Sequence, residues 1–197
     1  MTRTPPLYRQ EVVKNKDYLF FQTHGNASSE WTAINAARCL VAFGAPSHVQ
    51  VYPGAPQPLL LTAKHDPEIH GIDGLGGVEG LPDVDDPRVL SVFARNGDGS
   101  RVRALEGIST NIRNTWKNGS GDKVTVISSG PMTNIALFAS VYPELLDAVE
   151  EFVFMGGAVG MGNRSALAEY NIMCDRKSVS KFFFKFLLEL LLLLFFP

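Results

Sequence analysis

The chain has 197 residues, of which 45% are hydrophobic and 19% charged, with a formal net charge of −2. These values are typical of a soluble globular protein that is large enough for one domain with a core. The near-neutral balance and the absence of a Lys- or Arg-rich stripe argue against a nucleic-acid partner. Cys39 and Cys174 form neither a C-x-x-C pair nor a zinc-site spacing, and no export signal precedes them, so we expect a reduced, cytoplasmic protein.

Composition divides the chain into three parts. Residues 1–17 are polar and proline-bearing, which predicts a disordered leader. Residues 18–180 have the mixed pattern of a folded domain, and residues 181–197 form a Phe/Leu-rich tail.

The tail has three interpretations. A spanning helix needs about 20 mostly apolar residues, and Lys185 and Glu189 interrupt the run, so a membrane anchor is disfavoured. A buried helix would be expected to show a polar face at helical spacing, which the run lacks. The favoured hypothesis is translated intron or frameshifted sequence, because Phe, Leu, Ser and Pro all have pyrimidine-rich codons.

The domain begins with a strand, a helix and a second strand. Residues 18–23 form a short apolar run that predicts a strand. Ser28 or Ser29 is positioned to cap the following helix, and Gly44 is positioned to end it. Residues 48–52 alternate like a strand.

The next part of the chain is rich in loops. Residues 69–87, with many Gly and Asp, predict a mobile loop, and the charge and glycine content of residues 85–107 indicates a surface insertion. Ile108, Ile112 and Trp116 lie four apart and predict one face of a helix.

Two further strands are predicted at residues 123–127 and 152–155, with a helix starting at Thr133. The repeated order of strand, turn and helix predicts an α/β fold with a mainly parallel sheet. Glycines and polar residues follow each strand, at 25–26, 53–54, 130–131 and 155–157. Because ligands gather at the carboxyl ends of parallel strands, we expect these segments to form one site.

Several common catalytic motifs are absent. No G-x-G-x-x-G follows a strand, Gly is never followed by Lys as in a Walker motif, and H-E-x-x-H and G-x-S-x-G do not occur. Dinucleotide, nucleoside-triphosphate and serine-hydrolase chemistry are therefore disfavoured.

The segment from Met155 to Asn171 predicts a ligand-binding wall. It opens with a double glycine after a strand and then carries Asn163, Glu169 and Asn171. Glycines allow close backbone approach, and amide and carboxylate groups suit a hydroxyl-rich ligand.

Five pieces in one order carry a family resemblance: Thr23-His-Gly-Asn26 with Asn35, Val51-Tyr-Pro-Gly54 with Pro58-Leu59, Ile69-His-Gly71 with Asp73-Gly-Leu-Gly-Gly77, Gly130-Pro-Met-Thr-Asn134, and Met155 through Asn171. The set resembles the inosine–uridine-preferring nucleoside hydrolases, from about Leu19 to Ser178. The resemblance implies a Rossmann-like open sheet and a Ca²⁺-dependent enzyme, commonly a homo-oligomer. Its substrates would be ribonucleosides such as inosine or uridine, whose N-glycosidic bond it hydrolyses.

The resemblance also implies roles for individual residues. Asn26 and Asn171 would hold ribose hydroxyls, and Asn163 and Glu169 would meet the 5′-hydroxyl. The remaining roles are Met155 near the sugar, Tyr170 near the base or sugar edge, His70 lining the pocket, and Thr133 offering its backbone carbonyl to the metal. Structural roles remain open as alternatives: a turn or cap for Asn26, a surface position for His70, a helix cap for Thr133 and a core position for Met155.

The family's catalytic aspartates are not found. The family opens with a strand and a D-x-D-P-G-x-D-D cluster, and nothing like it precedes Tyr18. A second metal aspartate, beside a histidine, would lie past the start of the tail. We therefore identify no catalytic residue and expect the chain not to retain Ca²⁺ and to be impaired as a hydrolase. The alternatives are a non-catalytic remnant that binds nucleosides or joins other subunits, and a tail-anchored protein.

Overall fold

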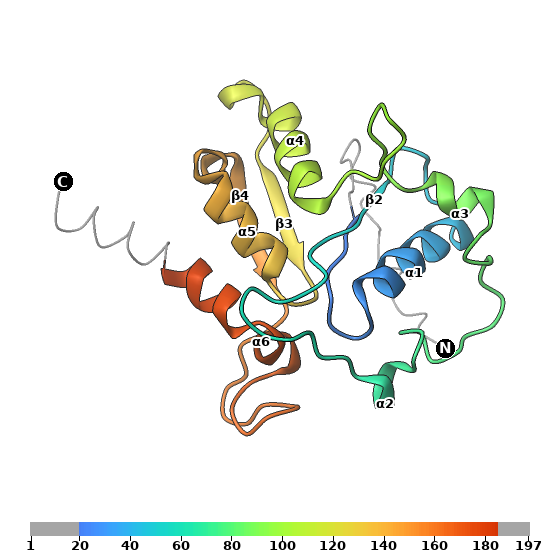
Figure 1. The fold of residues 1–197 in the computed structure, drawn as a ribbon. Helices are drawn as coiled ribbons and strands as arrows, with labels where there is room; N and C mark the ends of the chain where they lie inside the picture. Colours follow the sequence, from blue (N-terminus) through green and yellow to red (C-terminus); the bar gives the residue numbers. More distant parts are fainter. Residues whose placement is uncertain (1–19, 185–197) are drawn as a thin grey trace, which may run out of the picture.

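The computed structural model describes residues 20–184, so the predicted leader and residues 185–197 of the predicted tail lie outside it. Its strands are β1 (Phe20–Phe21), β2 (Val51–Tyr52), β3 (Val124–Ser128) and β4 (Val149–Phe154). β1 pairs with β2 and β3 pairs with β4, both in parallel (Figure 1). The predicted α/β class with parallel strands is confirmed.

The first helix, α1 (Ser29–Ala42), lies between β1 and β2 and has the predicted ends. The Ser28 hydroxyl accepts a hydrogen bond from the Trp31 amide at 3.2 Å, as an N-cap does. Past the helix end, Gly44 has a φ of +66° and its amide bonds to the Val41 carbonyl. The helix therefore begins after the predicted N-cap and ends before the predicted glycine.

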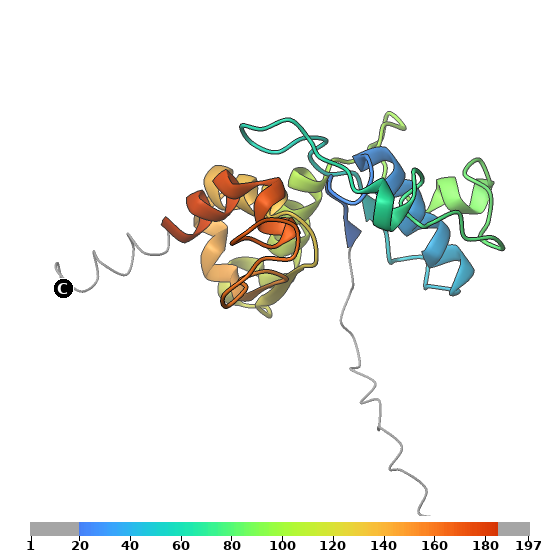
Figure 2. The same ribbon diagram turned by 90° about the horizontal axis from the view of Figure 1, so that it is seen from below.

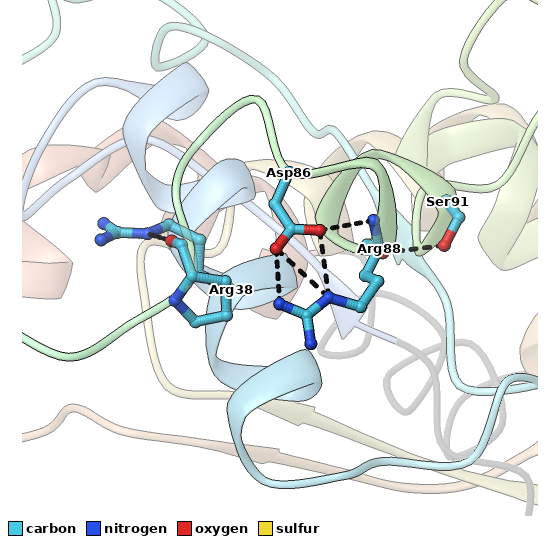
Figure 3. Close-up of polar contacts among 5 residues, drawn as sticks. Arg38, Asp86, Arg88 and Ser91 are labelled. Carbon is cyan, nitrogen blue, oxygen red and sulfur yellow. Dashed lines mark hydrogen bonds and ion pairs between the residues drawn. The ribbon is translucent and has the colours of Figure 1, made fainter.

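The prediction of a surface insertion at residues 85–107 is wrong. This segment contains the helix α3 (Pro87–Ser91), which packs against α1. Val89 and Phe93 are fully buried in a cluster with Val51, and Phe93 forms a parallel bridge to that strand residue. The charged residues that suggested an insertion include an ion pair: Arg88 pairs with Asp86, the N-cap of α3, at 2.6 Å (Figure 3).

The predicted loop at residues 69–87 overlaps the end of the short helix α2 (Pro67–His70) and is irregular up to α3. It is held to α1 at two points. Asn35 donates to the Asp73 carbonyl at 2.6 Å, and Arg38 donates to the Pro82 carbonyl at 2.7 Å (Figure 3).

The second half of the fold has its own core. Its further elements are α4 (Ala104–Trp116), the short helix η1 (Lys117–Gly119), α5 (Thr133–Val141) and the short helix η2 (Pro143–Ala148). The predicted apolar face of α4 is confirmed, since Ile108 and Ile112 are buried with Phe138, Leu145 and Val149.

The chain continues into α6 (Tyr170–Cys174) and helical residues 176–184. Phe182 is buried against Ile135 of α5, and its ring meets that of Phe152 edge-on at 5.0 Å. Within residues 20–184, no helix combines the length and the apolar character needed to cross a bilayer.

The two strand pairs do not hydrogen-bond to each other within residues 20–184. Figures 1 and 2 show β1, β2, α1 and α3 on one side of the molecule and β3, β4 and α5 on the other. The helix α4 contacts both β1 and β3 and so spans the interval between the two pairs.

Candidate functional site

The glycine-rich strand ends of the two halves meet. A Cβ atom on Gly25, after β1, would lie 3.3 Å from Pro131, and one on Gly130, after β3, would lie 2.9 Å from Thr23. The amide of Met155, after β4, donates to the Ser128 carbonyl at 2.8 Å. Three of the four segments expected at one site are thus brought together.

The fourth segment, after β2, is joined through Asn134 of α5. Its amide oxygen accepts from the Ala55 amide at 2.9 Å, and its amide nitrogen donates to the Gln22 carbonyl at 2.8 Å. A Cβ on Gly54 would lie 1.7 Å from that carbonyl oxygen, so only glycine fits this junction.

Two polar residues of the predicted wall, Glu169 and Asn163, form hydrogen bonds within the wall segment itself. Glu169 accepts hydrogen bonds from the amides of Gly157 and Ala158, the second at 2.8 Å. Asn163 accepts from the Tyr170 amide at 2.9 Å. These contacts fold residues 157–169 back on themselves and fix where α6 begins.

Asn171 and Tyr170 then attach α6 to the strand ends. The Asn171 amide donates to the carbonyls of Ser129 at 3.0 Å and Met155 at 3.2 Å. The Tyr170 hydroxyl donates to the Gly25 carbonyl at 3.1 Å. Burial, with a smaller contribution from Cys174, raises the pKa of Tyr170, so its hydroxyl stays protonated as a donor.

A cavity of about 440 Å³ lies between the ends of β1 and β3. Asn26 lines it with an exposed side chain, together with Ser129 and Gly130. Asn26 and Asn171 are each adjacent in sequence to one partner of the Gly25–Tyr170 hydrogen bond. The two predicted ribose-binding amides therefore lie at the same edge of the fold.

Other predicted residues lie elsewhere. His70 ends α2 and does not line the cavity, although its carbonyl accepts from Gly76 and shapes the loop. Met155 is 63% exposed. Arg164, which the sequence reasoning did not select, forms a bidentate ion pair with Asp66, with its Nε at 2.8 Å, and links the wall to α2.

Sequence reasoning also missed a buried polar chain beneath the strand ends. The His24 ring lies 3.0 Å from the Thr133 hydroxyl, which donates to Asp175 at 2.6 Å. Asp175 also accepts from the Leu59 amide at 3.0 Å and from Ser178. All three members of the chain are at most 1% exposed.

The charge states in this chain follow from burial and hydrogen bonding. Burial raises the pKa of Asp175, but the bonds from Ser178, Thr133 and Leu59 outweigh it, and the pKa lies below its usual value. Burial lowers the pKa of His24, which Asp175 partly opposes. The neutral His24 ring and the ionised Asp175 carboxylate are therefore linked through the Thr133 hydroxyl.

The hydroxyl of Thr133 fixes the tautomer of His24. Because this hydroxyl donates to Asp175, it accepts from the Nε2–H of His24. The other ring nitrogen, Nδ1, then carries a lone pair. Within residues 20–184, this atom and the Thr23 hydroxyl are buried without a hydrogen-bond partner.

One sequence signal could have found Asp175. It stands three residues before Ser178, at the start of helical residues 176–184, and its Oδ1 accepts from the Ser178 amide at 3.0 Å, as an N-cap does. Its link to Thr133, 42 residues earlier, leaves no trace in local sequence.

The described residues do not fit Ca²⁺ on their own. Among residues 20–184, no three His, Cys, Asp or Glu side chains gather where they could hold a metal ion. Both carboxylate oxygens of Asp175 already accept hydrogen bonds from protein groups. Since Ca²⁺ takes six to eight oxygen ligands, the proposed carbonyl of Thr133 would need many further donors.

Comparison with known proteins places these features in context. A family model described as inosine-uridine preferring nucleoside hydrolase matches residues 20–188. The pyrimidine-specific ribonucleoside hydrolase RihA of Shewanella woodyi is 35% identical over 159 residues, which cover 81% of this chain and 45% of that protein. An uncharacterised protein of Schizosaccharomyces pombe is 34% identical over 154 residues, 77% of this chain and 41% of its own length.

Solved structures agree on the fold. A purine-preferring ribonucleoside hydrolase from Gardnerella vaginalis matches with a TM-score of 0.68 and 28% identity, over 84% of this chain and 48% of that one. An inosine-guanosine nucleoside hydrolase matches with a TM-score of 0.65 and 22% identity, over 83% and 46%. The chain thus spans less than half the length of these relatives.

Proposed function

Because the chain belongs to the inosine-uridine preferring nucleoside hydrolase family, we propose that the protein acts on ribonucleosides. The reaction is hydrolysis of the N-glycosidic bond, in which a nucleoside and water give a free base and ribose. The observation that carries this proposal is the Gly25–Tyr170 hydrogen bond, which joins the segments of Asn26 and Asn171. Asn26 lines the cavity, and Asn171 donates to the carbonyl of Ser129, which also lines it.

The proposed ribose contacts follow from the chemistry of the two amides. Asn171 uses its amide nitrogen for Ser129 and Met155, and no described residue donates to its Oδ1. This oxygen is a suitable acceptor for a ribose hydroxyl, and the exposed amide of Asn26 offers both a donor and an acceptor. A vicinal diol needs this combination, because each hydroxyl both donates and accepts.

Glu169 and Asn163 are proposed to meet the 5′-hydroxyl. Glu169 uses one carboxylate oxygen for the amides of the glycine turn, and its other oxygen accepts from no described residue. The negative charge beside the sugar also favours the oxocarbenium-like transition state of glycosidic cleavage.

Water activation has no assigned residue in the described part of the chain. We therefore propose that the 197-residue chain binds ribonucleosides but releases ribose slowly, if at all. Binding without hydrolysis is the alternative function for the chain by itself, because activation of water requires a placed general base.

Calorimetric titration tests the binding step. We expect uridine and inosine to bind, and 2′-deoxyuridine to bind about tenfold more weakly, since one lost hydrogen bond in a closed site has that effect. The variant Asn171→Ala should weaken uridine binding by a similar factor. Asn96→Ala is the matched control, because Asn96 bonds only within its own exposed turn. Equal affinity for uridine and 2′-deoxyuridine would contradict the proposed ribose contacts.

A ribose-release assay on inosine and uridine, with and without Ca²⁺, tests the chemical step separately. Little release accompanied by binding fits the proposal for this chain. Rapid Ca²⁺-dependent release would confirm the hydrolase reaction and refute the proposed impairment.

A further inference from the structure

Residues 157–169 of the wall have no apolar packing that would hold them in place. None of these residues is buried, and they form an irregular loop beside α6 (Figure 1). Val159, Met161 and Leu167 are at least 80% exposed. Because burial of apolar side chains is the usual force that fixes one segment against another, the position of this loop depends on its polar contacts.

Within residues 20–184, Arg164 carries the polar contact that fixes the middle of the loop to another part of the fold. Its guanidinium donates to both carboxylate oxygens of Asp66, with Nε at 2.8 Å. The other hydrogen bonds of residues 158–168 all have their partners within residues 157–170. The Arg164–Asp66 ion pair therefore decides where the middle of the wall lies.

The carboxylate of Asp66 is committed to Arg164. Asp66 is the N-cap of α2, yet its side chain forms no cap hydrogen bond and binds the guanidinium instead. The Asp66 side chain is 10% exposed and that of Arg164 is 32% exposed. A bidentate pair that is partly withdrawn from water has a more fixed geometry than an exposed single contact. Glu68, at 3.9 Å from Arg164 and 85% exposed, adds little to it.

The same aspartate is bonded to the turn that carries Asn26. The Asp66 amide donates to the Asn26 carbonyl at 3.2 Å, while the Asp66 carboxylate holds Arg164. Arg164 directly follows Asn163, whose Oδ1 accepts from the Tyr170 amide at 2.9 Å. A path of direct contacts therefore leads from Asn26 to Asn163.

The hydrogen bond from Tyr170 to Gly25 closes this path into a ring. The Tyr170 hydroxyl donates to the Gly25 carbonyl at 3.1 Å, and Gly25 directly precedes Asn26. The turn after β1 is thus tied to the wall twice, once by a neutral hydrogen bond and once by an ion pair. One tie alone would let the wall pivot about it, whereas two ties fix its orientation.

We propose that Arg164 and Asp66 are positioning residues for the ribose, and that their ion pair sets the place of Asn163 relative to Asn26. Neither side chain contacts the sugar. The pair keeps the 5′-hydroxyl contact at a fixed distance from the diol contact, so that one ribose meets both. This inference rests on the proposed function, in which Asn26 and Asn163 bind the sugar.

Hydrogen exchange on the ligand-free, full 197-residue chain tests the placement of Asn163. The Tyr170 amide begins α6 and has no acceptor within the helix, so its protection depends on Asn163. Arg164→Ala should speed its exchange about tenfold. The Met173 amide, which donates to the Glu169 carbonyl inside the helix, should keep its rate. Equal acceleration at both amides would show general loosening of α6 and would overturn the proposal.

Further variants isolate the ion pair. Asp66→Asn removes the charge but keeps the backbone bond to Asn26, and it should speed exchange at Tyr170 as Arg164→Ala does. The double variant should have no larger effect, because both changes remove the same contact. Arg164→Lys keeps the charge and should restore part of the protection. 

The matched control is Arg113→Ala. This change also removes an arginine from an ion pair, since Arg113 of α4 lies 2.7 Å from Glu144 of η2. It should leave the exchange rates of Tyr170 and Met173 unchanged.

Calorimetry with uridine and 5′-deoxyuridine links the ion pair to the sugar. The unmodified chain should bind 5′-deoxyuridine about tenfold more weakly than uridine, because one hydrogen bond is lost. In Arg164→Ala this ratio should fall to about twofold, since Asn163 no longer lies where it meets the 5′-hydroxyl. A role in overall stability alone would weaken both ligands equally and would leave the ratio unchanged.

The outcomes separate this inference from the proposed function. An unchanged exchange rate at Tyr170 in Arg164→Ala, or the same uridine to 5′-deoxyuridine ratio in both proteins, would overturn the positioning role. If the unmodified chain binds no uridine, the proposed function fails, and exchange at the Tyr170 amide still decides whether the pair places Asn163.

Discussion

At the scale of single residues, the buried chain His24–Thr133–Asp175 holds the strand ends in place. It joins the turn after β1, the start of α5 and the segment after α6 through two hydrogen bonds of 3.0 and 2.6 Å. These two bonds are stabilising while Asp175 is ionised and His24 is neutral. Two predictions follow from its charge states.

The first prediction concerns the carboxylate. Asp175→Asn removes the charge that accepts bonds from Thr133, Ser178 and Leu59. We expect the free energy of unfolding to fall by about 2 kcal/mol, measured by urea denaturation. Asp147→Asn, at an exposed position, serves as the control and should change little. Equal stability of the two variants would show that the network contributes nothing.

The second prediction concerns pH. His24 has a lowered folded pKa, so below its usual value of 6.5 the unfolded state takes up a proton that the folded state does not. Stability should therefore fall as the pH drops below about 6.5. The lowered pKa of Asp175 adds a loss in the same direction below about its usual 3.8. His24→Gln should flatten the upper part of the profile, and an unchanged slope in that variant would refute the assignment.

The site was only partly predictable from sequence. Asn26 stands just after a strand and Asn171 in the segment that follows the double glycine, which are local signals, but their ribose-binding role came from the family resemblance. Their present hydrogen-bond partners, and the isolation of His70 from the cavity, depend on contacts between distant segments. The link of Asp175 to Thr133 was missed for the same reason, since Thr133 lies on another element.

At the scale of elements, caps and turns set the junctions on which the site depends. Ser28 and Gly44 bound α1 as expected from sequence, because caps act within a few residues. The segment 85–107 was misjudged, because its buried residues Val89 and Phe93 stand in a stretch rich in charge and glycine and complete a cluster formed elsewhere.

A glycine substitution tests the junction of β1, β2 and α5. Gly54→Ala would place a methyl group 1.7 Å from the Gln22 carbonyl and 2.4 Å from the Asn134 amide. We expect a loss of about 3 kcal/mol in unfolding free energy, because backbone must move to relieve the overlap. Gly97→Ala is the control, since no atom lies within 4 Å of its Cβ position. Similar stability of both variants would argue against this packing.

At the scale of the whole molecule, the β1–β2 pair and the β3–β4 pair both contribute residues to one cavity, and the family model matches both pairs. Four of the five motifs lie at or just after a strand, and the fifth, residues 69–77, covers the end of α2 and the loop after it. The assignment of residues 181–197 to a separate tail stays a prediction, although Phe182 packs in the core.

The extent of the folded part can be measured with two phenylalanines. Phe182 is 5% exposed and Phe184 is 65% exposed. Phe182→Ala should lower the unfolding free energy by about 3 kcal/mol, whereas Phe184→Ala should change it by less than about 0.5 kcal/mol. Thermal or urea unfolding of both variants gives the comparison. If Phe182→Ala lowers the unfolding free energy as little as Phe184→Ala does, the core ends before residue 181.

Contact of ribose with Asn26 and Asn171, which we propose as the ribose-binding edge, can be measured by NMR of the side-chain amides. On titration with uridine, we expect saturable shifts in the amide signals of these two residues. Little change is expected at Asn96 or at Asn111 of α4, whose amide donates to the Gly107 carbonyl and the Tyr52 hydroxyl. Titration with 2′-deoxyuridine should give weaker shifts at the same signals. Shifts confined to Asn96 or Asn111, or no saturable change at Asn26 and Asn171, would contradict this proposal.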